Sequence, residues 1–200
     1  MNKRSGIETR KHIVDAAMEI FSAKGYAAAN MREIAQSAGT SVGGMYLYFK
    51  NKEELYQSLI REKRNSLNSM IEMSTSQART AKEALSSFVK LNFDHVVKHK
   101  EFILLHIREH GFAFSLEEKK QFFRQQINHL EKIIKKGTLS GEFRKCNARD
   151  MAKIIGGSLR GIIISIALDE GPSVSPGMLS KFFLNNLLKE EISDQYHNEK

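Results

Sequence analysis

Residues 30–49 read NMREIAQSAGTSVGGMYLYF, and this stretch decides how the chain folds. Asn30 is a favourable N-cap and Glu33, three residues later, completes a capping box, so a first short helix follows. Gly39 ends that helix, because glycine tolerates the left-handed conformation found at helix C-termini. Ser41 then caps a second helix, whose apolar residues recur at helical spacing up to residue 49. The stretch therefore predicts a helix-turn-helix, a motif that can enter the major groove of DNA.

The sequence on both sides of this motif predicts further helices. Apolar residues recur at helical spacing, and no alternating strand pattern with hairpin turns is present. A helix before the motif ends at Gly25, and Asn51 opens a long helix with a polar middle. Further helix starts are predicted at Thr80, Ser115, Asn147 and Ser175, a break at 98–101, and a glycine cap at Gly137. We expect an all-α protein of about nine helices, with a small domain over residues 1–50 and a larger helical body over residues 51–200.

The charge distribution favours an acidic partner. The 200 residues carry a formal net charge of +8, and residues 1–52 hold eight lysines and arginines against four acids. Positive charge is therefore densest around the motif, as expected for a nucleic-acid-binding protein. The single cysteine, Cys146, allows no intrachain disulfide and fits a reducing compartment. The N-terminus lacks the apolar run of a signal peptide, and the most apolar run, residues 162–168, is too short to cross a bilayer. We expect a soluble, cytoplasmic protein without a membrane partner.

Between residues 8 and 56 the chain carries many residues at fixed spacing. They are Thr9, Arg10, Ile13, Ala16, Ala17, Phe21, Gly25, Tyr26, Ile34, Ala35, Ala38, Gly39, Ser41, Gly43, Tyr46, Phe49, Lys52, Glu53 and Leu55. This pattern resembles the TetR family of tetracycline-repressor-like transcription regulators. The rest of the chain resembles that family in its length, its helical character and the Gly-Glu-Phe-Arg stretch at 141–144. The resemblance implies a regulator, neither an enzyme nor a cofactor-binding protein, that binds a palindromic double-stranded DNA operator as a homodimer. A small lipophilic effector would release it from the operator.

The resemblance also assigns roles within the motif. Phosphate contacts are expected from Thr40, Tyr46 and Lys52, and Asn30 and Arg32 suit the same role. Base contacts then fall to the exposed residues of the second helix and its end: Ser41, Val42, Gly44, Leu47 and Tyr48. These side chains offer few hydrogen bonds, and the helix carries no arginine placed for guanine. We therefore expect recognition to depend on phosphate contacts and on the spacing of two copies.

The larger body is expected to bind the effector and to form the dimer. The helix over residues 151–168 becomes apolar on all sides, so it needs cover from every direction. The predicted dimer interface comprises Gly156, Gly157, Gly161, Ile164, Phe182, Phe183 and Leu187. The predicted effector pocket is lined by Phe88, Phe102, His106, Phe122, Phe123 and Arg160. Arg160 interrupts an apolar helix, and a buried cation there requires either an internal acid or an anionic ligand group.

Two alternatives belong to other classes of function. Residues 106–110, with His106, Glu109 and His110, match the H-x-x-E-H string of some zinc peptidases, and His95 and His99 add a second pair. All four histidines would share one face if a single helix ran through them, although neighbouring lysines would repel a metal ion. The other alternative is a ligand-binding dimer that does not bind an operator. Only the two adjacent glycines of the second motif helix, which weaken it, favour that reading.

Overall fold

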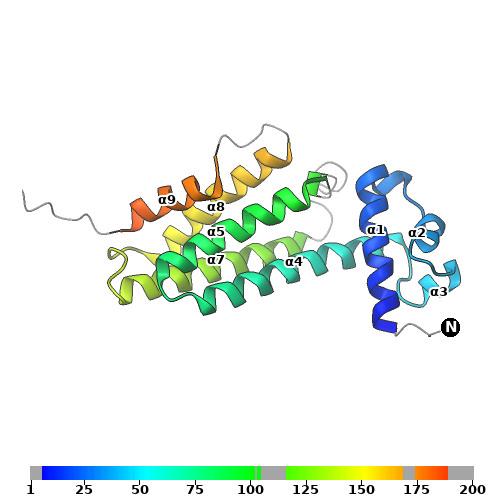
Figure 1. Ribbon diagram of the computed structural model, residues 1–200, viewed down its shortest axis with the longest axis horizontal. Coiled ribbons are helices and arrows are strands. Elements are labelled where there is room, and N and C mark those ends of the chain that lie inside the picture. The colour runs from blue at the N-terminus through cyan, green and yellow to red at the C-terminus, as the bar shows by residue number, and fades with distance from the viewer. Residues whose placement is uncertain (1–5, 102, 105–115, 169–173, 189–200) are drawn as a thin grey trace, which may run out of the picture.

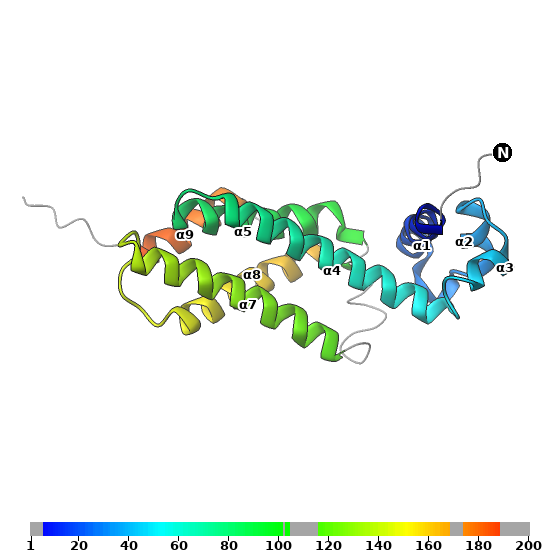
Figure 2. The same ribbon diagram turned by 90° about the horizontal axis from the view of Figure 1, so that it is seen from below.

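The computed structural model describes residues 6–101, 103–104, 116–168 and 174–188. Within these ranges it contains eight helices and no β-sheet, which confirms the predicted all-α class. The helices are α1 (Gly6–Ala28), α2 (Met31–Ser37), α3 (Val42–Tyr46), α4 (Lys52–Gln77), α5 (Ala81–Lys98), α7 (Leu116–Leu139), α8 (Ala148–Ala167) and α9 (Pro176–Leu187). The molecule is elongated, with α1–α3 at one end and the remaining helices bundled at the other (Figures 1 and 2).

The predicted helix-turn-helix is formed by α2 and α3. The side chain of Asn30 accepts a hydrogen bond from the N–H of Glu33 at 2.9 Å, and Ser41 accepts one from Gly44 at 2.9 Å. Each bond satisfies one of the N–H groups that a helix start leaves unpaired. Between the two helices Gly39 adopts φ 66°, which only glycine adopts without strain. Both predicted N-caps and the predicted glycine turn are therefore confirmed.

Two details of the motif differ from the prediction. The carboxylate of Glu33 pairs with Lys24, so it ties α2 to α1 instead of closing a capping box. The second helix ends at Tyr46 rather than continuing to Phe49. Two consecutive glycines inside so short a helix cost about 1 kcal/mol each relative to alanine, which accounts for its early end.

The first helix packs behind the motif and changes direction at Gly25. Ile13, Ala17 and Phe21 recur at helical spacing and are fully buried. Gly25 has φ 82° and ψ 164°, outside the helical region, so the regular helix ends at the predicted residue. One further turn, up to Ala28, follows this kink before α2 begins.

Helix α4 belongs to two hydrophobic cores. The first core is built from α1–α3 and from the start of α4, including Leu55, Tyr56 and Leu59. The second begins at Leu67 and is built from α4, α5, α7, α8 and α9. The turns of α4 between the two cores are polar, as predicted, and both ribbon views show α4 running from the small unit into the body (Figures 1 and 2). Because one continuous helix enters both cores, it links their orientations.

The far end of the body is held together by the loop between α7 and α8. The carboxylate of Glu142 accepts hydrogen bonds from the N–H groups of Ala81 and Lys82 at the start of α5, at 2.8–3.2 Å. Gly137 lies inside α7, so its predicted role as a helix cap is wrong. A Cβ atom on Gly137 would lie 2.2 Å from the Phe143 ring, which shows that glycine is needed there for close packing.

The predicted break at 98–101 is present. Helix α5 ends at Lys98, and His99 has non-helical angles of φ −120° and ψ 26°. At the other end of the bundle, Ser175 caps α9 with Pro176 in its first turn, as predicted. None of the helices in the described ranges has the length and apolar composition that crossing a lipid bilayer requires.

Candidate functional site

The residues predicted to contact DNA gather around α2, α3 and the start of α4, on the side of α1 that faces away from the body (Figures 1 and 2). Leu47 is 85% exposed and Tyr46 is 49% exposed, although both side chains are largely apolar. Asn30, Arg32 and Ser41 are also exposed, and the half-buried members of the set are Thr40, Val42, Gly44, Tyr48 and Lys52. An apolar side chain held in water beside polar groups suits contact with a partner, for example with thymine methyl groups.

The two glycines of α3 have different roles. A Cβ atom on Gly44 would lie 2.9 Å from the Thr40 hydroxyl and 3.1 Å from the Ser41 hydroxyl, so a larger residue there would displace these hydroxyls and disturb the cap. Gly44 is therefore accounted for without DNA. A Cβ atom on Gly43 would meet no atom within 4 Å. Gly43 thus leaves the exposed backbone of α3 uncovered, which permits close approach of a partner.

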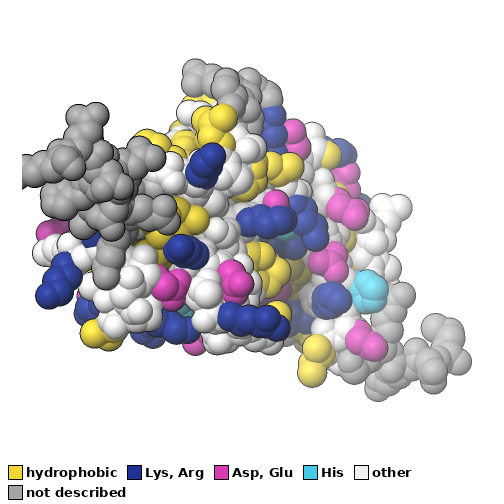
Figure 3. All heavy atoms as spheres, turned by 60° about the vertical axis from the view of Figure 1, so that its left-hand side comes forward, with side chains coloured by type: hydrophobic (Ala, Val, Ile, Leu, Met, Phe, Trp, Pro, Cys, Tyr) yellow, Lys and Arg dark blue, Asp and Glu magenta, His cyan; other side chains and the backbone are white. Residues whose placement is uncertain are grey.

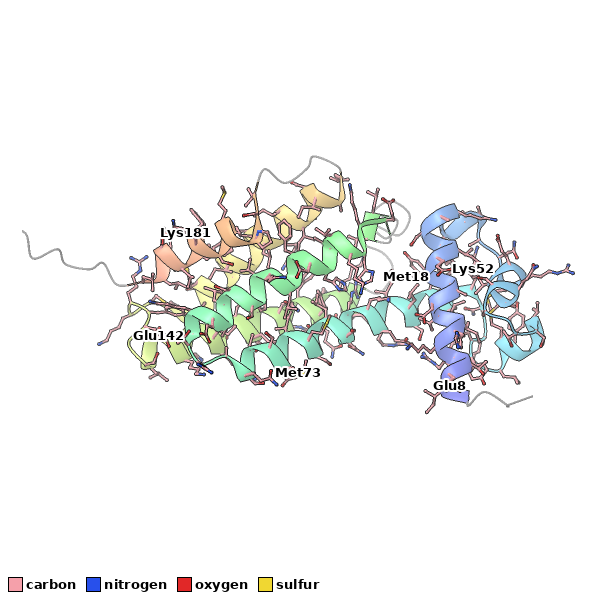
Figure 4. All side chains as sticks on the ribbon, viewed as in Figure 1. Glu8, Met18, Lys52, Met73, Glu142 and Lys181 are labelled. Carbon is pink, nitrogen blue, oxygen red and sulfur yellow. The ribbon has the colours of Figure 1, made fainter. Side chains whose placement is uncertain are left out.

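Lys52 does not present the free ammonium on which its predicted phosphate contact depends. Its Nζ donates hydrogen bonds to the carbonyl oxygens of Tyr26 (2.7 Å), Ala27 (3.2 Å) and Ala29 (2.9 Å). It also lies 4.5 Å from the centre of the Tyr26 ring. Figure 4 labels Lys52 at the junction of α1 with the start of α4. Lys52 therefore binds the carbonyl end of α1, a role that the sequence reasoning did not predict.

Arg10 makes a second tie between α1 and the rest of the small unit, which the sequence reasoning missed. Its guanidinium pairs with Glu62, donates to the Ser58 hydroxyl at 2.6 Å and lies 5.1 Å from the centre of the Phe49 ring. These contacts join α1 to α4 and to the segment that follows α3. The partners lie 39–52 residues from Arg10 in sequence, so no local pattern could have revealed them.

The predicted effector residues do not form one pocket among the described residues. Phe88 is buried in the core of the body, whereas Phe122 and Phe123 are half-buried on α7. Arg160 is exposed, and its guanidinium lies 3.8 Å from the centre of the Phe123 ring. The prediction of a buried cation in α8 is therefore wrong, because Arg160 is exposed. Its guanidinium stacks on an aromatic ring instead of pairing with an acid. Phe102 and His106 lie outside the described residues.

His95 of α5 and His99, which follows the end of α5, lie beside cations. The rings of His95 and His99 are 4.8 Å apart. Burial, His99, Lys63 and Lys98 lower the pKa of His95 to about 4, so it is neutral at physiological pH. The single continuous helix required for a four-histidine face is interrupted at His99. In the part of the chain that the structure describes, no group of three or more His, Cys, Asp or Glu side chains is placed to hold a metal ion. Glu109 and His110 lie outside that part.

The predicted dimer residues divide into two groups. Phe183 and Leu187 are buried in the body, and a Cβ atom on Gly156 would lie 2.6 Å from Ile127 Cδ1 of α7, so these three residues pack within their own chain. The remaining four, Gly157, Gly161, Ile164 and Phe182, are exposed on α8 and α9. Exposed apolar side chains of the same two helices that were not predicted are Ile154, Leu168 and Met178.

We call the exposed positions 154, 157, 161 and 164 of α8 and its C-cap Leu168, together with Met178 and Phe182 of α9, the α8–α9 face. Ile154 is 61% exposed and Phe182 is 62% exposed. The α8 positions are spaced alternately by three and four residues, which is the pattern of a helix–helix seam. The spacing of these residues in the sequence could therefore have predicted this exposed seam. Figure 3 shows, on one side of the molecule, hydrophobic side chains open to solvent among lysines and arginines.

Comparison with known proteins gives two family matches. Residues 13–59 match the model described as "Bacterial regulatory proteins, tetR family". Residues 113–170 match the model described as "QacR-like protein, C-terminal region". The first match covers the helix-turn-helix, and the second covers α7 and α8.

Individual relatives agree with these matches. The fatty acid metabolism regulator protein of Bacillus subtilis (strain 168) is 31% identical over 135 residues, which are 66% of this chain and 70% of that protein. The crystal structure of FadR from Bacillus subtilis in complex with stearoyl-CoA has 27% identity and a TM-score of 0.70, covering 90% of this chain and 97% of that chain. FadR from Bacillus halodurans, at 24% identity, has a TM-score of 0.70 and covers 88% of this chain and 95% of its own.

Proposed function

Because the chain belongs to the TetR family of bacterial regulatory proteins, we propose that it represses transcription as a homodimer on a palindromic operator and leaves that operator when a small lipophilic effector binds. The observation that carries the proposal is the exposed second helix of the motif. Two caps and a glycine turn fix α3 against α2, while Leu47 and Tyr46 project into solvent. Such a helix reads base edges with its exposed residues while the surrounding groups contact phosphates.

The α8–α9 face supports the homodimer. Five large apolar side chains of this face are open to solvent in one chain, and the exposed glycines Gly157 and Gly161 allow a partner helix to approach closely. When the faces of two copies pack together, each covers the apolar side chains of the other. Dimerisation places two recognition helices about 34–36 Å apart, one turn of DNA, and thereby accounts for recognition by a helix with few base-reading groups.

The path from the body to the DNA-binding unit runs through α4. We place the boundary of the two units in the polar turns between residues 60 and 67, because Leu55, Tyr56 and Leu59 belong to the first core. A cleft of about 720 Å³ separates α1 from the end of α5, and Met18 points from α1 towards the body (Figure 4). This cleft leaves room for a change of angle between the units. A coupling of about 1–3 kcal/mol would weaken operator binding about 5- to 150-fold.

The effector class is proposed from a relative. One FadR structure at 27% identity is a complex with stearoyl-CoA, so we propose a long-chain acyl compound. The test is operator affinity, measured by fluorescence anisotropy, with and without acyl-CoA thioesters of increasing chain length. Weakening of at least fivefold by a saturating acyl compound is expected. An unchanged affinity with every compound that binds the protein would reject effector-dependent release.

A further inference from the structure

A polar pocket of about 210 Å³ lies between α4 and α7, in the turns of α4 that separate the two cores. Its α4 wall includes Arg61, Arg64 and Asn68, and its α7 wall includes Glu118, Phe122 and Gln125. The two helices come from different parts of the sequence, so the pocket exists only in the folded protein. Neither the motif nor the α8–α9 face contributes to it.

The pocket carries more positive than negative charge. Arg61 and Arg64 lie one turn apart on α4, and the one acid of the lining, Glu118, forms an ion pair with Arg61 at 3.3 Å. The guanidinium of Arg64 lies 5.7 Å from the centre of the Phe122 ring, which fixes it beside the pocket. Lys119 lies near Arg64 but outside the pocket lining, and burial together with Arg64 lowers its pKa. An anion entering here would meet two guanidinium groups and one carboxylate, Glu118, which also lies close enough to Arg64 to oppose the lowering of that guanidinium's pKa by burial.

Two amide side chains of the pocket lining, Asn68 and Gln125, belong to a chain of hydrogen-bonded amides that continues behind the pocket. Asn68 Nδ2 donates to Gln125 Oε1 at 2.7 Å, and Gln126 Nε2 donates to Asn68 Oδ1 at 2.6 Å. Asn92 of α5 continues the chain, because its Nδ2 donates to Gln126 Oε1 at 3.3 Å. Since these amides bond to one another, their orientation is set before any ligand arrives. A pre-organised polar site of this kind loses little entropy on binding.

The same turns of α4 contact the DNA-binding unit on another side. Ser58 and Glu62 bind Arg10 of α1, whereas Arg61 and Arg64 line the pocket. A group bound by the two arginines therefore lies within about one helical turn of the tie to α1. Any shift of α4 that the group causes is passed to α1 through Arg10.

We propose that this pocket binds the anionic head group of the effector, a carboxylate or a phosphate, through the guanidinium groups of Arg61 and Arg64. The inference rests on the proposed acyl effector and assigns the polar end of that molecule a position on α4. Guanidinium groups form paired, charge-assisted hydrogen bonds to both kinds of oxyanion. The Phe122 ring and the stems of the arginines provide the apolar contact that the first carbons of a chain need.

The test compares three twelve-carbon probes by isothermal titration calorimetry: dodecanoate, dodecanoyl-CoA and uncharged 1-dodecanol. The variants Arg61→Gln and Arg64→Gln each remove a lining cation, and Lys63→Gln removes the same charge from the same turn outside the lining. We expect each lining variant to lower the affinity for the anionic probe that binds by tenfold or more, since hydrogen bonds to a charged group are lost. Binding of 1-dodecanol should change by less than twofold, and Lys63→Gln should change every affinity by less than threefold. A loss seen for dodecanoyl-CoA and absent for dodecanoate identifies phosphate as the head group, and the reverse identifies carboxylate.

Three outcomes would overturn the assignment: equal losses for the anionic and neutral probes, no loss in either lining variant, or a wild-type protein that binds neither anion more tightly than 1-dodecanol. Thermal melts establish that the variants are folded, and the exposed Arg61 keeps the test decisive if Arg64→Gln does not fold. Operator affinity is measured in the same samples. Anion binding that depends on both arginines but leaves operator affinity unchanged would support the pocket and contradict the proposed release mechanism.

Discussion

Lys52→Met removes the ammonium that holds the carbonyl end of α1, and its effect can be worked out from three hydrogen bonds. The acceptors are the carbonyls of Tyr26, Ala27 and Ala29, at 2.7, 3.2 and 2.9 Å. Hydrogen bonds to a charged group contribute about 1.5–3 kcal/mol each to the free energy of unfolding. Two effects reduce the net value: ordering the lysine side chain costs up to about 2 kcal/mol of rotamer entropy, and water can bind the exposed carbonyls once the ammonium is removed. We therefore expect the free energy of unfolding to fall by about 2–3 kcal/mol. For a chain of this size, that corresponds to a melting temperature about 4–12 °C lower.

The same variant separates this role from a phosphate contact. If Lys52 touched a phosphate, its loss would reduce the slope of log binding constant against log salt by about 0.9. With its ammonium held by carbonyls, the slope should stay unchanged, although affinity falls because α1 and α2 are less well positioned. Fluorescence anisotropy on one duplex at several salt concentrations measures the slope, at a temperature where every variant is folded. Arg32→Ala, which removes an exposed cation of α2, should lower the slope by about 0.9, and Lys50→Met serves as a stability control. A Lys52→Met protein with an unchanged melting temperature and a reduced slope would refute the reasoning.

Three further predictions test the body. Burial opposes ionisation of Glu142, but the hydrogen bonds from the N–H groups of Ala81 and Lys82 outweigh this effect and lower its pKa. Glu142→Ala should therefore lower the free energy of unfolding by about 1–2 kcal/mol at pH 7, and the difference from wild type should vanish as the pH falls through that lowered pKa. Equal melting temperatures of the two proteins at pH 7 would contradict the cap. Because the pKa of His95 is lowered to about 4, its contribution to the free energy of unfolding is complete above about pH 6.5 and is lost as the pH falls towards 4. Wild type should therefore lose about 2 kcal/mol of stability from this group between pH 7 and pH 5. In denaturant titrations this loss should be absent from His95→Gln and present in the control His12→Gln. Phe182→Asp should shift the protein to monomer in analytical ultracentrifugation, whereas Lys181→Asp should not, and equal sedimentation of both variants would argue against the α8–α9 face.

Local rules predicted the motif well because its determinants are close in sequence. Asn30 and Ser41 each cap a helix through an N–H three residues away, and Gly25 and Gly39 adopt the positive φ values that only glycine tolerates. These features depend on backbone geometry rather than on tertiary packing. The same holds for Ser175, whose cap lies at the start of α9.

The roles that the sequence did not reveal depend on partners outside the residue's own helix. Gly137 is needed for contact with the Phe143 ring and Gly156 for contact with Ile127 of another helix, so a glycine in the sequence does not reveal whether it caps or packs. Arg160 lies over Phe123 of α7, which no pattern within α8 could show. The acceptors of Lys52 lie 23–26 residues earlier in the chain.

The α8–α9 face was predicted only in part, for a different reason. Its α8 residues recur at alternating spacings of three and four, which the sequence displays from Ile154 to Leu168. An apolar run through the middle of the helix hides this seam, since both the core side and the exposed side carry isoleucines. Burial in the structure separates the two sides: Ile155 and Ile166 are buried, whereas Ile154 and Ile164 are exposed.

The central claim is that α3 reads DNA from two copies of this chain, and selection of bound fragments from a genomic DNA library tests it most directly. After several rounds with the purified 200-residue chain, sequencing should yield fragments that share an inverted repeat. The centres of its two half-sites should lie one helical turn, about 34–36 Å, or a multiple of it apart. Fragments recovered in proportion to their abundance in the starting library, with no shared repeat, would contradict the claim.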